Sequence, residues 1–299
     1  MKVLVTGAQG MLSHDLLPAL RQAGHQVIPS DVRPSTEPDF VVLDITDREA
    51  VRKTFLEIRP DAVINTAAYT NVDQAETDED MAYRINALGP WNLALACQEA
   101  DIPLMQVSTD YVFDGKKGSA YDEYDMPNPI GVYGRSKYAG EVHVEKLWPK
   151  HYIVRTAWLY GIGGKNFVET ILKAASERPE LKVVNDQWGC PTWTVDLARV
   201  MVDLLPTGQY GTYHASGEGE CTWQDFAKEI VRLGGMATPV LPQSTEELNR
   251  PAPRPTYSVM RKRGLQMAGI SLMPRWEASL LHYFRAHKGL ELAANRLST

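Results

Sequence analysis

The sequence predicts an α/β fold, a doubly wound parallel sheet with a smaller α/β lobe. Three features of its 299 residues indicate this fold. Short runs of β-branched and other apolar residues alternate with amphipathic stretches through the first half of the chain. The strand-like runs are almost continuously apolar, as expected of parallel strands covered on both faces. After about residue 155 the alternation becomes less regular, which indicates a second and smaller unit.

The order of the elements follows from where each pattern starts and ends. The predicted strands of the first half cover residues 2–7, 25–31, 40–45, 61–68 and 103–113. The helices between them cover 12–24, 49–60 and much of 68–103. The first of these helices shows the helical period in Leu12, Leu16, Leu17 and Leu20. In the second half, helices are expected at 166–179 and 194–206, with a short strand at 181–186.

Two units are therefore expected, residues 1–155 and residues 156–299. The second unit should lie mainly over the carboxyl ends of the sheet, because doubly wound sheets use that edge to bind ligands. Some of its segments are expected to return and complete the first unit.

Composition and charge exclude several classes of protein. Lys and Arg total 31 against 37 Asp and Glu, and the sequence contains no long run of basic residues. Nucleic acid is therefore not an expected partner. No apolar run approaches a membrane span and no signal peptide is recognisable, so we expect a cytoplasmic protein without a membrane partner. The three cysteines and seven histidines lack the spacing of a zinc site, and no metal ligand is predicted from the residues.

A glycine loop joins the first strand to the first helix. Gly7 allows the tight turn, and Gly10 lets the backbone approach a pyrophosphate at the helix N-terminus, where Met11 and Leu12 begin the helix. Ser13 stands where a third glycine usually allows close packing of helix and strand. The loop predicts a dinucleotide cofactor.

The ends of the next strands support this prediction. Asp31 ends the second strand, about 20 residues past the glycines, where a carboxylate accepts hydrogen bonds from a ribose. Arg33 would instead attract a 2′-phosphate, so the choice between NADPH and NADH stays open. The remaining predicted cofactor contacts, for the adenine and along the fourth strand end, are Asp44, Ile45, Ala67, Ala68 and Tyr69.

Two further segments predict the chemistry. Ser108, Thr109 and Asp110 end the fifth strand, and Tyr133 and Lys137 begin the next helix with a spacing that puts both on one face. An ammonium beside a phenol is expected to lower the pKa of Tyr133, so that this residue can donate a proton to a carbonyl oxygen. Thr109 would hydrogen-bond the same oxygen, and Lys137 would also hold the cofactor.

Five segments carry a resemblance to a known family, the extended short-chain dehydrogenases and, within them, the dTDP-4-dehydrorhamnose reductases. The resemblance covers nearly the whole chain. The segments are NTAAYTNVDQAE at 65–76, STDYVFDG at 108–115, VYGRSKYAGE at 132–141, RTAWLYG at 155–161 and NDQWGCPT at 185–192.

The resemblance implies an NAD(P)H-dependent oxidoreductase with a Rossmann-like cofactor domain, mainly residues 1–155, and a substrate-binding lobe, mainly residues 156–299. The family's catalytic residues fall on Thr109, Tyr133 and Lys137. The implied reaction reduces the 4-keto group of dTDP-6-deoxy-L-lyxo-4-hexulose and gives dTDP-L-rhamnose. Substrate contacts are implied for Thr109, Tyr111, Trp158 and Arg254, although Arg254 would equally stabilise its own loop.

The resemblance also suggests a homodimer bridged by a metal ion, because some members of the family form such dimers through acidic residues. Asp15 and Asp196 lie near those positions, but surface aspartates are more often simply solvated. Both Mg²⁺ and the homodimer therefore stay open.

Related activities remain to be distinguished. A 4,6-dehydratase needs a Glu directly after the Asp that follows the catalytic Thr, and Tyr111 stands there, so dehydration is disfavoured. A 4-epimerase would use the same Tyr and Lys, and reductases that make other deoxysugars, including dihydrostreptose, share these motifs. A non-catalytic subunit resembling the β subunit of methionine adenosyltransferase is the alternative from another class, because fold does not decide function.

Overall fold

The computed structural model describes residues 1–287, so residues 288–299 of the expected second unit lie outside the described residues. At its centre is a seven-stranded parallel sheet in the order β11-β6-β5-β4-β1-β2-β3. This sheet confirms the predicted doubly wound fold. Its strands are β1 (Lys2–Thr6), β2 (Gln26–Asp31), β3 (Val41–Val42), β4 (Ala62–Asn65), β5 (Leu104–Thr109), β6 (His151–Thr156) and β11 (Gly211–His214).

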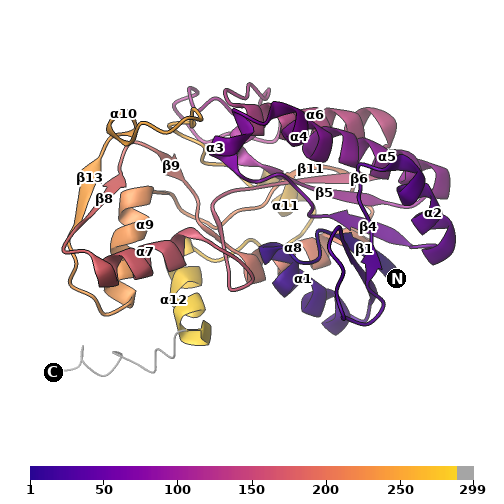
Figure 1. Cartoon of the computed structure of the whole chain (residues 1–299), viewed down its shortest axis with the longest axis horizontal. Coiled ribbons are helices and arrows are strands. Elements are labelled where there is room, and N and C mark those ends of the chain that lie inside the picture. The colour runs from indigo at the N-terminus through magenta and orange to yellow at the C-terminus, as the bar shows by residue number, and fades with distance from the viewer. Residues whose placement is uncertain (288–299) are drawn as a thin grey trace.

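Helices cover both faces of the sheet (Figure 1). Val3 and Val5 of β1 point to a core shared with α1 (Met11–Gln22), α8 (Thr194–Leu204) and α11 (Arg263–Met267). Leu4, between them, points to the opposite core, because side chains alternate along a strand. The opposite core is closed by α2 (Arg48–Ile58), α5 (Gly89–Ala100) and α6 (Val132–Leu147).

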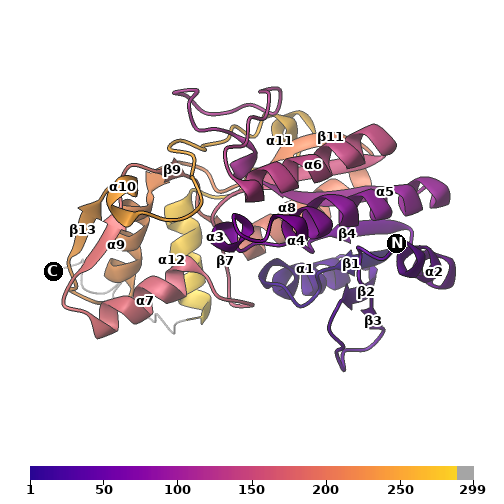
Figure 2. The same cartoon turned by 45° about the horizontal axis from the view of Figure 1, so that its top comes forward.

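A smaller lobe lies beside the sheet, at the left of Figures 1 and 2. Its aromatic core includes Tyr160, Phe226 and Tyr283. The lobe consists of α7 (Phe167–Glu177), α9 (Trp223–Leu233), α10 (Thr245–Leu248) and α12 (Trp276–His287) with three short ladders. The ladders pair β7 (Leu159–Tyr160) with β10 (Thr192–Trp193), β9 (Trp188–Gly189) with β12 (Cys221–Thr222), and β8 (Leu181–Val184) with β13 (Val240–Gln243).

Two later segments lie with the sheet. Strand β11 pairs with β6, and α8, which continues into a 3₁₀ turn at Leu205–Thr207, packs on α1. The division of the chain at residue 155 stays a prediction. Within residues 1–287, no helix is both long and apolar enough to cross a bilayer.

Several expected elements differ in extent, and the strand expected at 61–68 already ends at Asn65. The strand expected at 40–45 is reduced to two residues, because Asp44 accepts the Thr46 N–H at 2.8 Å and turns the chain towards α2. The strand expected at 103–113 ends at Thr109, whose side chain caps a 3₁₀ turn at Asp110–Val112. The helical stretch between 68 and 103 is divided into α3 (Val72–Ala75), α4 (Glu79–Tyr83), a π-helical turn (Arg84–Leu88) and α5.

Candidate active site

A cleft of about 990 Å³ opens at the carboxyl ends of the strands, where the chain winds in opposite directions on the two sides of β1 and β4. Open α/β sheets bind ligands at this point. Tyr69 and Arg254 are not among the residues that line the cleft. The predicted site residues that do line it are Gly7, Gly10, Met11, Leu12, Asp31, Arg33, Asp44, Ile45, Ala67, Ala68, Thr109, Tyr111, Tyr133, Lys137 and Trp158.

The glycine loop has a geometry that only glycine allows at its first position. Gly7 has φ +74°, and a Cβ on it would lie 2.5 Å from the Ala67 nitrogen. Gly10 is the N-cap of α1 and has no side chain to bind the free amides of the first turn. These amides and the positive end of the helix dipole fit the pyrophosphate of a dinucleotide.

The residues around this loop tie it to the neighbouring strands. Ser13, at the expected third glycine position, is fully buried. Its hydroxyl oxygen lies 2.9 Å from that of Thr66, so the buried hydroxyl has a hydrogen-bond partner. Asp31 ends β2 and accepts the backbone N–H of Gln9 at 3.1 Å. Asp31 therefore both braces the loop and presents a carboxylate to the cleft, while the neighbouring Arg33 is exposed.

The predicted catalytic residues come from the end of β5 and the start of α6. The Thr109 hydroxyl donates to Asp110 at 3.1 Å and accepts the N–H of Tyr111 at 3.2 Å. The rings of Tyr111 and Tyr133 meet edge to face with centroids 5.5 Å apart. Lys137 is buried and donates to the carbonyl of Val107 at 2.7 Å. The three predicted groups thus face one cleft.

Burial controls the protonation of these groups. It raises the pKa of Tyr133 to about 12, despite a hydrogen bond with Thr109 that lowers it. The pKa of Tyr133 was expected to be lowered by Lys137, and for the protein without cofactor that expectation is wrong. Burial also lowers the pKa of Lys137 to about 8 and raises that of Asp110 to about 6. A high pKa keeps the Tyr133 phenol protonated, which is the form a proton donor needs.

A π-helical turn positions α6, and sequence reasoning missed it. Asn86, in this turn, accepts the N–H of Tyr69 at 2.8 Å and donates to the Ser136 hydroxyl at 3.0 Å. Gly140 packs so closely against this turn that a Cβ would lie 2.1 Å from the Asn86 carbonyl oxygen. Contacts with this turn therefore help to hold α6, the helix that carries Tyr133 and Lys137.

Trp158 lies in the cleft as expected, but both of its faces are covered. Trp223 stacks on it with centroids 3.5 Å apart and planes 9° apart. On the other side, a Cβ on Gly189 would lie 2.4 Å from the indole. Trp158 also has φ +47°, which a bulky residue rarely adopts. Sequence reasoning missed Trp223, although the Thr222–Asp225 capping box marks the helix start that carries it.

Arg254 and Tyr69, which do not line the cleft, bind other residues near it. Arg254 forms an ion pair with Asp73 at 2.9 Å and donates to the Ala252 carbonyl at 2.8 Å. These contacts agree with the loop-stabilising interpretation, while its guanidinium also reaches the phenol of Tyr111. The hydroxyl of Tyr69 donates to Asp78 at 3.3 Å, so Tyr69 belongs to the wall behind Tyr133.

The two aspartates considered for a metal site bind hydroxyls of their own chain. Asp15 accepts a hydrogen bond from Thr194, and Asp196 accepts one from Ser279 at 2.5 Å. In the part of the chain that the structure describes, no group of three or more His, Cys, Asp or Glu side chains is arranged to hold a metal ion.

Comparison with known proteins agrees with this architecture. A family model described as the RmlD substrate binding domain matches residues 1–288. A dTDP-4-dehydrorhamnose reductase of Streptomyces griseus is 42% identical over 290 residues, which cover 95% of this chain and 93% of the relative.

Two solved structures of proteins with that name are similar to the chain. The protein from Clostridium acetobutylicum has a TM-score of 0.91 and 46% identity, covering 96% of this chain and 100% of its own. The protein from Bacillus anthracis, solved in complex with NADP, has a TM-score of 0.90 and 44% identity, covering 95% and 99%. The chain therefore belongs to the RmlD family of extended short-chain dehydrogenases, the family of the dTDP-4-dehydrorhamnose reductases.

Proposed function

We propose that this protein is a dTDP-4-dehydrorhamnose reductase that uses NADPH or NADH to reduce the 4-keto group of a dTDP-linked deoxyhexulose to dTDP-L-rhamnose. The observation that carries the proposal is the meeting of Thr109, Tyr133 and Lys137 in one cleft with an uncapped helix N-terminus. The names of its relatives support the substrate, and the NADP complex of one of them supports the cofactor.

The chain's own residues supply binding and a proton. The first-turn amides of α1 would bind the pyrophosphate, and the bound cofactor would supply the hydride. Tyr133, whose pKa burial raises to about 12, would donate its proton to the sugar carbonyl oxygen as that oxygen gains charge. Thr109 would orient the same oxygen. The cationic Lys137 would stabilise the phenolate left on Tyr133 and hold the cofactor ribose.

Trp158 would contact the sugar through its edge, because Trp223 and Gly189 cover its two faces. Arg254, which pairs with Asp73 and reaches the phenol of Tyr111, would bind the nucleotide diphosphate. The cytoplasmic location stays a prediction, and a homodimer and bound Mg²⁺ stay open.

Both nicotinamide cofactors are expected to support activity, because Asp31 and Arg33 favour opposite ones. Arg33→Ala should lower kcat/KM for NADPH by about tenfold to a hundredfold, the loss typical of one charge-assisted hydrogen bond, and should spare NADH. Asp31→Asn should weaken NADH use by a similar factor while it keeps an acceptor for Gln9. Steady-state kinetics with both cofactors measure this, and complete exclusion of one cofactor by the unchanged protein would contradict it.

The reaction is tested by mixing the purified protein with NADPH and dTDP-6-deoxy-L-lyxo-4-hexulose. Loss of nicotinamide absorbance in a 1:1 ratio to dTDP-L-rhamnose, identified by NMR, is the expected result. Isomerisation of a nucleotide sugar without added reduced cofactor would indicate an epimerase instead. Tight cofactor binding with no oxidation of any dTDP-linked keto sugar would overturn the proposal and favour a non-catalytic role.

A further inference from the structure

A row of titratable side chains extends from the cleft into the interior along one face of α6. Tyr133, Lys137 and Glu141 follow one another at intervals of four residues, so they lie on the same side of the helix. Lys137 is 4% exposed and Glu141 is 2% exposed. Charged side chains are rarely this buried unless they are paired, and the row therefore needs an explanation.

Glu141 is held by a guanidinium that contacts both of its carboxylate oxygens. Arg155 of β6 contacts both carboxylate oxygens, with Nε 3.0 Å from Oε1 and Nη2 2.6 Å from Oε2. Its remaining nitrogen, Nη1, lies 3.5 Å from Nε2 of His214. This geometry fixes one orientation of the carboxylate, with Arg155 on one side of it.

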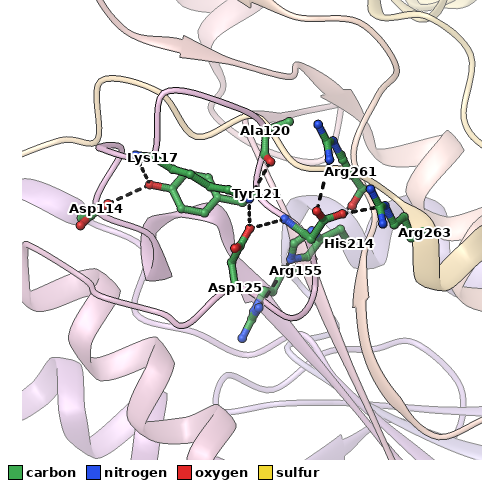
Figure 3. Close-up of polar contacts among 10 residues, drawn as sticks. Asp114, Lys117, Ala120, Tyr121, Asp125, Arg155, His214, Arg261 and Arg263 are labelled. Carbon is green, nitrogen blue, oxygen red and sulfur yellow. Dashed lines mark hydrogen bonds and ion pairs between the residues drawn. The ribbon is translucent and has the colours of Figure 1, made fainter.

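His214 closes the row as a neutral side chain. Its Nδ1 lies 2.9 Å from the Arg261 carbonyl oxygen, so Nδ1 carries the proton and Nε2 is free to accept from Arg155. Burial lowers the pKa of His214 to about 3, with Arg155 acting in the same direction. Figure 3 shows Arg155 beside His214, with Asp125 and Arg261 around them. The row thus alternates in charge as Lys137, Glu141 and Arg155.

Lys137 has few other charges to balance its own. Burial disfavours its ammonium, and Glu141 is the charged neighbour that opposes this effect. Asp110, the other buried carboxylate at the cleft, acts on Tyr133. The other titratable and charged groups of α6 are Tyr133, Arg135, Tyr138, His143, Glu145 and Lys146. The elements packed against α6 carry Asp73, Glu79, Asp80, Tyr83, Arg84, Cys97, Glu99, Asp110, Tyr111, His151, Tyr152 and Arg155.

We propose that Glu141 is a positioning residue for the reaction: held in place by Arg155 and His214, its carboxylate keeps the buried ammonium of Lys137 charged. Without this carboxylate, Lys137 would lose its proton near neutral pH and could no longer stabilise the phenolate of Tyr133. A purely structural ion pair would need Glu141 and Arg155 but would leave the titration of Lys137 unchanged.

The test is the titration of Lys137 in the cofactor-free protein, followed by NMR with ¹³C-labelled lysine and assigned by the signal lost in Lys137→Arg. In Glu141→Gln the midpoint should fall by about one pH unit or more, the size of the effect of one nearby charge. Glu141→Asp should restore part of the shift. The control is Glu145→Gln, which removes an exposed carboxylate one turn further along α6 and should leave the midpoint unchanged.

Glu141→Gln leaves Arg155 buried without its anion, which can prevent folding. A second variant avoids this unpaired charge. Glu141→Leu combined with Arg155→Met removes both charges at similar volume, and it should lower the Lys137 midpoint by less than Glu141→Gln, because the loss of the more distant cation partly offsets the loss of the anion. An unchanged midpoint in either folded variant overturns the inference. The alkaline limb of kcat/KM should move to lower pH together with the midpoint, and an unmoved limb would also overturn it.

The inference rests on the role proposed for Lys137, but the NMR titration needs neither substrate nor turnover. A shifted midpoint in a protein that reduces no keto sugar would support the link between Glu141 and Lys137 while it overturned the proposed function. An unshifted midpoint in an active reductase would overturn the link between Glu141 and Lys137 and support the proposed function.

Discussion

Replacing Tyr133 with Phe is expected to lower kcat by about 10²–10⁴-fold, the usual contribution of a positioned general acid. The change removes only the phenol oxygen, and the ring can keep its edge-to-face contact with Tyr111. NADPH affinity should stay within a few-fold of the original value, because the predicted pyrophosphate and ribose contacts are untouched. Steady-state kinetics and a fluorescence titration with NADPH measure the two quantities separately.

The matched control for this variant is Tyr138→Phe. Tyr138 lies on the same helix and is also half-buried, but it packs in the cluster around Phe113. It should keep near-normal turnover. If Tyr133→Phe also turned over at a near-normal rate, Tyr133 would not be the proton donor, and a water molecule or Thr109 would have to take that role.

The parts of the site that follow from local sequence were predictable. Gly7 and Gly10 come directly after an apolar strand, and Tyr133 and Lys137 share a helix face through their spacing alone. The carboxyl ends of parallel strands meet at one edge, so the order of these motifs along the chain was enough to bring them to one cleft.

The parts that depend on distant partners were not predictable. Glu141 and Arg155 both stand in segments that carry the family resemblance, yet their pairing appears only when α6 packs on β6. Charged residues are mostly exposed, so sequence favours the surface for each of them. Similarly, the family resemblance singles out Arg254, but only the fold shows that Asp73 binds it.

The pKa of Tyr133 illustrates the same limit. Helix spacing correctly places Lys137 near it, and a nearby ammonium does favour a phenolate. Burial opposes that effect by raising the pKa of Tyr133. The size of this rise depends on how many elements pack around the ring. The apolar residues packed with the Tyr133 ring come from α3, α4, α6 and the segment that contains Tyr69. In this protein burial is larger, so the phenol stays protonated.

Replacing Gly7 with Ala is expected to have the largest effect on cofactor binding. A left-handed backbone costs a non-glycine residue about 1–2 kcal/mol, and forced overlap in a packed region costs typically about 1–3 kcal/mol more. Here the overlapping atoms are the backbone of Thr66 and Ala67, which cannot rotate away as a side chain could. We expect a loss of about 3 kcal/mol in the free energy of unfolding, measured by urea denaturation.

The same displacement should weaken NADPH binding by about 100-fold, because the amides at the start of α1 would no longer meet the pyrophosphate in their original positions. Gly208→Ala is the matched control: Gly208 has a similar φ of +66°, but a Cβ there would meet no atom within 4 Å. It should lose only about 1–2 kcal/mol and keep full NADPH affinity. Equal destabilisation by the two variants, with NADPH affinity unchanged in both, would show that the close approach of Gly7 to Ala67 does not shape the cofactor site.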